Sequence, residues 1–234
     1  MAKIKYSALV SDMRNKLNGS VLSKNRYGNY IRNKVTPVNP QTSFQLNQRA
    51  NLSSLSAQWR GLTQSQRDAW AIAASERPFT DIFGDTKTLT GQALFVSVNL
   101  NLLAAGNSVI NDPGSSVSIP ALESVSLAVA SNAGGVIQDA DVTILPATVP
   151  ANFKLVVYGT PAYSAGISFV KNKYRYLGTF TPVAGVVDIS AALTARFGSA
   201  AVGKKVSVKL ALVSTISGQL GLPSSADAVI TLAV

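Results

Sequence analysis

The run Val206-Ser-Val-Lys-Leu-Ala-Leu212 decides the fold class of the C-terminal half, because an apolar residue stands at every second position. Successive side chains of a β-strand point to opposite faces of a sheet, so this alternation predicts a strand with one face in a core. The same period of two recurs in Val125-Ser-Leu-Ala-Val129 and in Val229-Ile-Thr-Leu-Ala-Val234. We therefore expect the C-terminal half to be built from β-strands.

The remaining strand candidates share a composition rich in β-branched and aromatic residues: Val142–Leu145, Phe153–Gly159, Gly166–Val170, Tyr174–Phe180 and Val183–Ile189. Glycine- and proline-containing turns separate them, and Ser190–Phe197 is expected to form one short helix. About seven short strands in about 115 residues are typical of an immunoglobulin-like or fibronectin-like β-sandwich. The sequence thus predicts such a sandwich over residues 115–234.

Helix signals fill residues 43–110. The predicted helices run from a cap at Thr42 or Ser43 to about Arg60, from Gln64 to about Ser75 behind a capping box of Thr63 and Gln66, and from Thr90 to about Ala105. The first two would form a helical hairpin, because only a few residues around Gly61 join them. We expect Trp59 and Trp70 to form the core of that hairpin, with a binding anchor as the alternative role.

Positive charge is concentrated at the N-terminus. The chain has 21 Lys and Arg against 11 Asp and Glu, a net charge of +10, and residues 1–49 alone hold nine basic residues and one acid. This segment also repeats Asn, Gly and Pro and is too poor in apolar residues to bury a core. Residues 1–42 are therefore predicted to be an extended basic arm that orders against another molecule, and a flexible solvated terminus is the alternative.

Within this arm, the segment from Gly19 to Val35 predicts a β-hairpin with its turn at Asn25–Asn29. Aromatic and cationic side chains alternate along it, and the candidate interaction residues are Lys24, Arg26, Tyr27, Tyr30, Arg32 and Lys34. Guanidinium and phenol groups suit a protein surface and a nucleic acid about equally well. The pattern alone leaves both partners open.

Composition argues against an enzyme. The chain has no Cys and no His, so it has no thiolate nucleophile, no histidine-based triad and none of the usual zinc or iron ligand sets. Phosphate-binding glycine motifs are absent, and we expect no cofactor and no metal. Asp139 and Asp141 are expected to be solvated strand residues, and the acids around Gly84 only faintly resemble a calcium loop. The longest uncharged stretch, Thr88 to Asn111, is too polar for a membrane span.

One further cationic pattern lies in the C-terminal half. Lys171, Lys173 and Arg175 alternate with Asn172, Tyr174 and Tyr176, which predicts an amphipathic strand with a cationic and an aromatic face. A second interpretation is a site for an anionic ligand, such as an acidic glycan or a nucleic acid.

Three motifs of the N-terminal half carry a resemblance: Gly19-Ser-Val-Leu-Ser-Lys-Asn-Arg-Tyr-Gly-Asn-Tyr-Ile-Arg32, Thr36-Pro-Val-Asn-Pro-Gln-Thr42 and Trp59-Arg-Gly-Leu-Thr-Gln-Ser-Gln-Arg-Asp-Ala-Trp70. With Phe83-Gly-Asp and Leu89-Thr-Gly-Gln-Ala-Leu-Phe95, this pattern resembles a group of structural-type proteins encoded by bacteriophages and prophages, often of Bacteroidota hosts. The resemblance covers roughly residues 15–105 and implies a viral context without a known chemistry.

A basic arm, a helical hairpin and a polar sandwich are together typical of a virion building block. We expect a capsid-associated protein, of the decoration or minor capsid type, that is anchored by its arm and displays an Ig-like domain in several copies. Its expected partners are the major capsid protein or neck and tail proteins. A neck or tail component and a nucleic-acid-binding virion protein are the alternatives, and a glycan-binding or host-attachment module comes next. Nucleic acid is disfavoured because the rest of the chain is nearly neutral.

Overall fold

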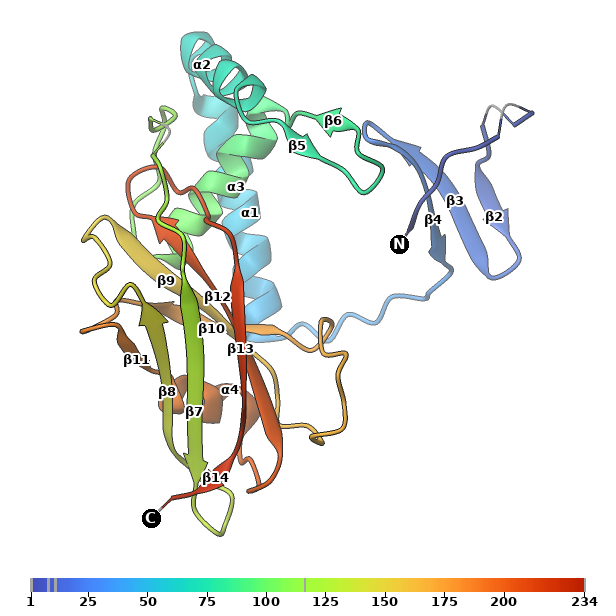
Figure 1. Cartoon of the computed structure of the whole chain (residues 1–234). Coiled ribbons are helices and arrows are strands. Elements are labelled where there is room, and N and C mark those ends of the chain that lie inside the picture. Colours follow the sequence, from blue (N-terminus) through green and yellow to red (C-terminus); the bar gives the residue numbers. More distant parts are fainter. Residues whose placement is uncertain (1, 8, 11, 116, 234) are drawn as a thin grey trace. The chain divides into compact units, whose positions relative to one another are not determined.

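The computed structural model describes residues 2–7, 9–10, 12–115 and 117–233 and contains both helices and several β-sheets (Figure 1). The chain is therefore of the α+β class, as expected. It divides by compactness into two units between Leu94 and Phe95. This division falls inside a helix, so the expected helical region 43–110 contributes to both units, which are described separately below.

The first unit begins with a four-stranded antiparallel sheet. Its strands are β1 (Ala2–Lys3), β2 (Asn15–Leu17), β3 (Ser20–Asn25) and β4 (Gly28–Asn33), in the order β1-β4-β3-β2. The predicted hairpin is the central β3–β4 pair, with Asn25 opposite Gly28 across a two-residue turn. The prediction of an extended arm missed the flanking strands β1 and β2.

Residues 34–42 have no helix or strand, and the helices follow them. These are α1 (Ser43–Gly61), α2 (Gln64–Ser75) and α3 (Gly91–Ala104), with a small hairpin of β5 (Phe79–Thr80) and β6 (Thr86–Lys87) between the last two. Thr42 caps α1 by accepting a hydrogen bond from the Gln45 N–H, and Thr63 forms a complete capping box with Gln66. Local side-chain chemistry therefore sets both helix starts where the sequence indicated.

The core of the first unit is small. Trp70 is fully buried, whereas Trp59 is only partly buried. Leu55 is the one buried residue of the long helix α1. Gly91 lies directly on α2, since a Cβ added there would stand 2.9 Å from the Ala71 backbone nitrogen. A larger residue at the start of α3 would push these two helices apart.

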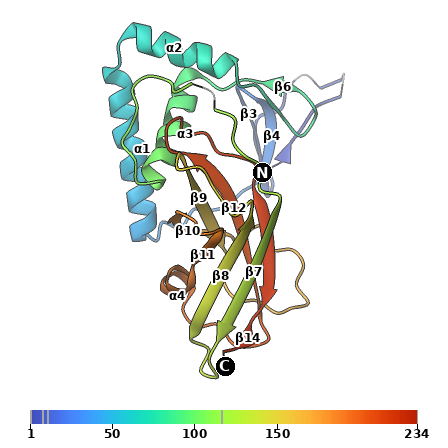
Figure 2. The same ribbon diagram turned by 60° about the vertical axis from the view of Figure 1, so that its left-hand side comes forward.

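The second unit is built on two four-stranded sheets that lie in two layers (Figure 2). One sheet has the order β10-β9-β12-β13, with β9 (Phe153–Gly159), β10 (Arg175–Phe180), β12 (Lys205–Ser214) and β13 (Ser224–Val229), all antiparallel. The other has the order β11-β8-β7-β14, with β7 (Ser124–Ser131), β8 (Ile137–Leu145), β11 (Val186–Asp188) and β14 (Thr231–Leu232). Only the β14–β7 pair of these described strands is parallel.

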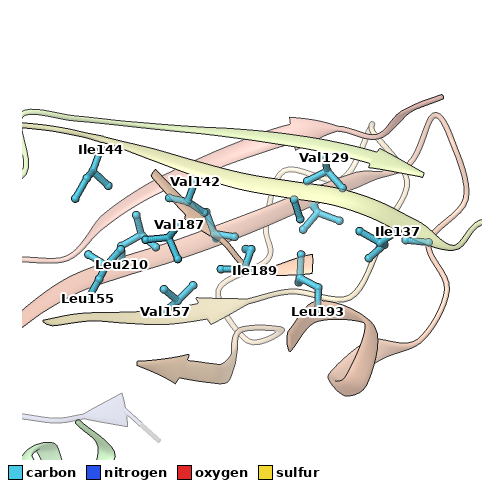
Figure 3. Close-up of a cluster of buried hydrophobic side chains, with 14 of the residues drawn as sticks. Val129, Ile137, Val142, Ile144, Leu155, Val157, Val187, Ile189, Leu193 and Leu210 are labelled. Carbon is cyan, nitrogen blue, oxygen red and sulfur yellow. The ribbon is translucent and has the colours of Figure 1, made fainter. Parts of the chain in front are cut away.

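The main core lies between these layers. Val142 and Ile144 of β8 face Leu155 of β9 and Leu210 of β12, and all four are fully buried (Figure 3). Leu193 of α4 (Ser190–Phe197) adds to the same cluster. The alternating apolar residues of Val206–Leu212 thus form the inward face of β12. Helix α4 has the bounds that the sequence predicted.

Two strand predictions were wrong. Gly166–Val170 forms no strand, and its apolar residues Ile167 and Phe169 are exposed because no neighbouring strand covers them. The last alternating run is shifted, because β13 begins at Ser224 and a separate short strand follows Ile230. Val234, the end of that predicted run, lies outside the described residues.

The C-terminal part of α3 belongs to the second unit and is fixed to the sheet of β9 and β10. The Tyr176 hydroxyl donates a hydrogen bond to the Ala104 carbonyl at 3.1 Å, and the Lys154 ammonium donates one to the Ala105 carbonyl at 2.5 Å. Ala105 packs with Val156 and Val213 on the outer face of this sheet. The end of the helix therefore covers one part of that face.

Candidate interaction surface of the N-terminal sheet

The strand register gives the first sheet a basic face. Lys3 and Ser23 both stand opposite Tyr30, and in the adjacent row Lys16 and Arg32 both stand opposite Val21. Directly opposite residues of antiparallel strands share a face, as do residues two apart on one strand. Lys3, Lys16, Tyr30 and Arg32 therefore occupy one side of the sheet, which we call the basic face.

The opposite side of the sheet is more apolar. Leu22 stands opposite Ile31 there, and Leu22 is buried. Lys24 belongs to this second side, because it pairs with Asn29. The predicted interaction residues are thus divided: Tyr30 and Arg32 lie together on the basic face, and Lys24 does not join them.

Tyr27 has a role within the chain. It lies in the β3–β4 turn, and its ring packs edge-on against Phe79 of β5, with ring centroids 6.0 Å apart. Its carbonyl accepts a hydrogen bond from the Lys87 ammonium at 2.7 Å. The neighbouring Arg26, like Lys34 after β4, is exposed to solvent. Tyr27 therefore holds the sheet to the β5–β6 hairpin.

Asp81 is the centre of that attachment. Its Oδ2 atom accepts hydrogen bonds from the ammonium groups of Lys3 at 3.0 Å and Lys87 at 2.6 Å. Its Oδ1 atom accepts the backbone N–H groups of Phe83 at 2.8 Å and Asp85 at 3.2 Å. One carboxylate oxygen thus binds the sheet, and the other fixes the turn of the hairpin.

The two ammonium groups determine the electrostatics of this site. Hydrogen bonds from Lys87 first and Lys3 second lower the pKa of Asp81 well below its ordinary value, although its side chain is almost fully buried. Both cations favour the ionised carboxylate more than burial opposes it. Asp81 is therefore negatively charged throughout the neutral range.

A second ion pair supports the first. Lys5 lies 3.2 Å from Asp85 and also stands over the Phe83 ring, 5.2 Å from its centroid. Sequence reasoning considered these acids only as a faint calcium loop. In the structure the carboxylates of Asp81 and Asp85 form ion pairs with lysine ammonium groups. Among the described residues, no group of three or more acids is placed so that it could hold a metal ion. These ion pairs could have been predicted from the charge distribution, because the arm has an excess of basic residues and segment 50–110 contains the acids nearest to it in sequence.

These contacts enclose a hollow of about 360 Å³ beside the β3–β4 turn. Its polar lining consists mainly of groups that are already ion-paired, including Lys3, Lys87 and Asp85. Asn29 also lines it, and its Oδ1 atom is buried without a hydrogen-bond partner among the described residues. We assign this hollow to the attachment of the sheet and not to chemistry on a substrate.

Helix α1 leaves several apolar side chains of the same unit partly exposed. Its apolar residues Phe44, Leu46 and Leu52 are each about half exposed, at 50%, 48% and 49%. Ile72 of α2 is 61% exposed. Phe44 and Leu46 are two residues apart and point to different sides of α1, so exposure alone does not make these side chains one contact surface.

The remaining sequence candidates lie in the second unit. Asp139 and Asp141 are both exposed on one face of β8, as expected for solvated strand residues. The cationic stretch is only partly a strand, because Lys171 and Lys173 lie in the turn that precedes β10 and Arg175 begins it. In the part of the chain that the structure describes, no helix is long and apolar enough to cross a membrane.

Comparison with known proteins identifies no family for this chain. No protein-family model matches the sequence, and no curated protein does. Among solved structures, the β-1,2-glucanase from Parabacteroides distasonis is similar at 16% sequence identity, over 50% of this chain and 14% of that enzyme, with a TM-score of 0.28. A similarity at this level supports no conclusion about fold or activity.

Proposed function

We propose that this chain is a non-enzymatic bacteriophage virion protein, associated with the capsid, that attaches to other virion proteins through its N-terminal sheet. One observation carries the proposal. Of the nine basic residues in the first 49, five make neither an ion pair nor a side-chain hydrogen bond with any described part of the chain: Lys16, Lys24, Arg26, Arg32 and Lys34. An acidic surface on another protein would complement this charge.

The proposed partner is an acidic protein surface on the major capsid protein or on neck and tail proteins. Positive and negative surface potentials that match steer two proteins together and fix their register. Attachment in many copies would place the protein in the virion.

We infer that the second unit is an immunoglobulin-like or fibronectin-like sandwich that the particle displays. Support comes from the division of its main strands, with β7, β8 and β11 in one sheet and β9, β10, β12 and β13 in the other. This unit has a large core of its own, which suits a displayed domain.

The test is a copy count by quantitative mass spectrometry on purified particles, normalised to the major capsid protein. Hundreds of copies would indicate a capsid position, and about a dozen would indicate a ring at the neck or tail. Absence from the particle would refute the proposal.

A pair of variants tests the basic face itself. Lys16→Gln with Arg32→Gln removes two unpaired cations without touching the Asp81 attachment, so incorporation into particles should fall while the protein stays folded. Lys171→Gln with Lys209→Gln, which makes the same charge change in the second unit, should incorporate normally. Equal incorporation of both pairs would exclude the basic face as the contact.

A nucleic-acid-binding virion protein is the second candidate, because the same five cations could neutralise phosphates. Binding of that kind falls steeply with salt, by a thousandfold or more between about 50 and 200 mM when several phosphates are contacted. We expect weak DNA binding that is lost at physiological salt. Tight binding under those conditions, together with normal incorporation of the Lys16 and Arg32 variant, would favour this candidate.

A further inference from the structure

The outer face of the β10-β9-β12-β13 sheet has a second distinct feature beyond the end of α3. A cleft of about 410 Å³ lies there, lined by two tyrosines, two lysines, a proline and two serines: Tyr158, Tyr174, Lys171, Lys209, Pro223, Ser224 and Ser225. Its volume lies within the range of about 300–1,000 Å³ that is common for small-ligand sites. The residues come from three strands and two loops, so the fold brings them together.

The register explains why three of these side chains meet. Lys209 of β12 stands directly opposite Tyr158 on one side and opposite Ser225 on the other. The next residues along the two central strands, Val157 and Leu210, are fully buried in the main core. Side chains alternate along a strand, so Tyr158, Lys209 and Ser225 point outward in one row.

Contacts within the unit hold the Tyr158 wall of the cleft in place. The Tyr158 ring packs edge-on against Tyr176, with centroids 5.8 Å apart, and the Tyr176 hydroxyl is itself bonded to Ala104. Tyr174 lies close to Ser207, whose hydroxyl is hydrogen-bonded to Tyr163 and which stands two residues from Lys209 on the same face of β12. Burial is the main cause that raises the pKa of both Tyr158 and Tyr174 above the ordinary value. Both phenols are therefore neutral hydrogen-bond donors at physiological pH.

The two cations of the cleft are not neutralised by the chain. Neither Lys171 nor Lys209 makes an ion pair with a described residue, and the residues that line the cleft include no acid. The nearby Lys205 differs, because it is paired with Asp227. A ligand for this cleft should therefore carry negative charge as well as a surface that packs on an aromatic ring.

We propose that this cleft binds an acidic saccharide, with Tyr158 and Tyr174 packing against the sugar ring and Lys171 and Lys209 binding its carboxylate. Ammonium groups form strong charge-assisted hydrogen bonds to carboxylates, and the serine hydroxyls can bond sugar hydroxyls. The inference is independent of the virion role, because it rests only on residues of the second unit.

A nucleic acid fits this cleft less well. Residues 95–234 carry eight basic and six acidic residues, so the unit has a net charge of only +2. Binding to a phosphate backbone relies on many cations spread along a stripe, and two lysines in one cleft do not make one. A single carboxylate on a sugar ring matches the two cations better.

The experiment is titration calorimetry with the full-length protein. The probes are oligosaccharides of polygalacturonate, alginate and polysialic acid, the fully methyl-esterified form of the first, and a single-stranded DNA oligonucleotide. We expect at least one acidic saccharide to bind, and if it is polygalacturonate, its methyl ester should bind at least about tenfold more weakly because the charge-assisted bonds are lost.

Variants assign the binding to the cleft. Lys171→Gln with Lys209→Gln should weaken the binding at least tenfold, and Tyr174→Ala should weaken it more than Tyr174→Phe, which keeps the ring. Arg60→Gln with Lys204→Gln, an equal charge change at exposed residues that line neither the cleft nor the basic face, should bind normally. The proposal is overturned if none of the three acidic saccharides binds, if the methyl ester binds as well as polygalacturonate, if DNA binds more tightly than every saccharide, or if the Lys171 and Lys209 variant binds normally.

Discussion

The first 94 residues and the rest of the chain obtain their order from different interactions. In the second unit, two sheets bury a continuous apolar core that includes fully buried residues from β8, β9 and β12. In the first unit, a sheet with a single buried residue, Leu22, is attached to a hairpin by ion pairs around Asp81. Apolar burial depends little on pH and salt, whereas ion pairs depend on both. The two units should therefore respond differently to the same perturbation.

The largest expected effect comes from removing α3 from the second unit. A fragment of residues 90–234 keeps Ala105 on the outer face of the sheet, and a fragment of residues 115–234 exposes Val156 and Val213. Burying one valine stabilises by about 1.5–3 kcal/mol, so the shorter fragment should be less stable by about 3–6 kcal/mol. Urea unfolding followed by far-UV circular dichroism measures this difference. Equal stability would show that α3 is not part of the unit.

A matched pair of leucines tests whether the units unfold separately. Leu210→Ala opens a cavity in the main core and should lower the free energy of unfolding of the second unit by about 2–5 kcal/mol. Leu22→Ala should affect the first unit and by less, since few buried side chains surround it.

Two probes separate these effects. Both tryptophans, Trp59 and Trp70, lie in the first unit, so tryptophan fluorescence reports on it alone. Leu210→Ala should shift the circular dichroism transition and leave the fluorescence transition unchanged. A single transition that both variants shift would mean that the two units unfold as one.

A smaller, local effect is expected at Asp81. Asp81→Asn keeps the Oδ1 acceptor that fixes the turn but replaces the Oδ2 acceptor of Lys3 and Lys87 with an amide donor. Amide hydrogen exchange should speed up in the described part of residues 2–33 and remain unchanged in the second unit. Unchanged exchange in the sheet would show that other contacts hold it.

Acid should reproduce this effect in the unaltered protein. The pKa of Asp81 is lower in the folded state than in the unfolded state, so its contribution is complete above the unfolded value and is lost as the pH falls through the folded one. The protection of the sheet's amides, which is the ratio of the intrinsic to the observed exchange rate, should therefore fall only below about pH 4, near the ordinary pKa of an aspartate. Asp81→Asn should remove this pH dependence, and a dependence that survives would have another source.

The smallest expected effect concerns the helix caps. Thr63→Ala removes half of a reciprocal capping box and should destabilise the first unit by about 1 kcal/mol, as measured by tryptophan fluorescence. Thr42→Ala is the matched change at α1, where the cap bond is longer, at 3.4 Å, and has no reciprocal partner described. Thr42→Ala should therefore lower the free energy of unfolding of the first unit by less than Thr63→Ala does. A larger loss from Thr42→Ala would contradict this ranking.

Local features of the sequence predicted most of the helices and long strands. Capping residues placed α1 and α2, and the period of two placed the buried face of β12. The strand β2 could also have been predicted, because Asn18-Gly19 is a strong hairpin signal and forms the two-residue turn before β3. Residues Gly166–Val170 have a composition typical of a strand but pair with no neighbouring strand. Whether a segment finds a pairing strand depends on the tertiary fold and cannot be seen in the local sequence.

Contacts between residues far apart in the sequence could not be predicted from local features. Lys3 meets Asp81 across 78 positions of the sequence, and no periodicity connects them. The cleft on the second unit has the same origin, since Tyr158, Lys209 and Ser225 become neighbours only through the order of three strands. The sequence analysis did name Tyr174 and Lys171, but it placed them in a strand, whereas β10 begins only at Arg175.

The link between the first sheet and α1 has a topological consequence. Residues 34–42 contain no helix or strand and can span up to about 30 Å when extended. Asp81 recognises an ammonium group and cannot distinguish its own Lys3 from that of an adjacent copy. In the crowded array of copies that we propose for the virion, each sheet would therefore be able to dock on the hairpin of a neighbour, by the same bonds that close the single chain. Such an exchange would join the copies into a chain of identical links without any new contact surface.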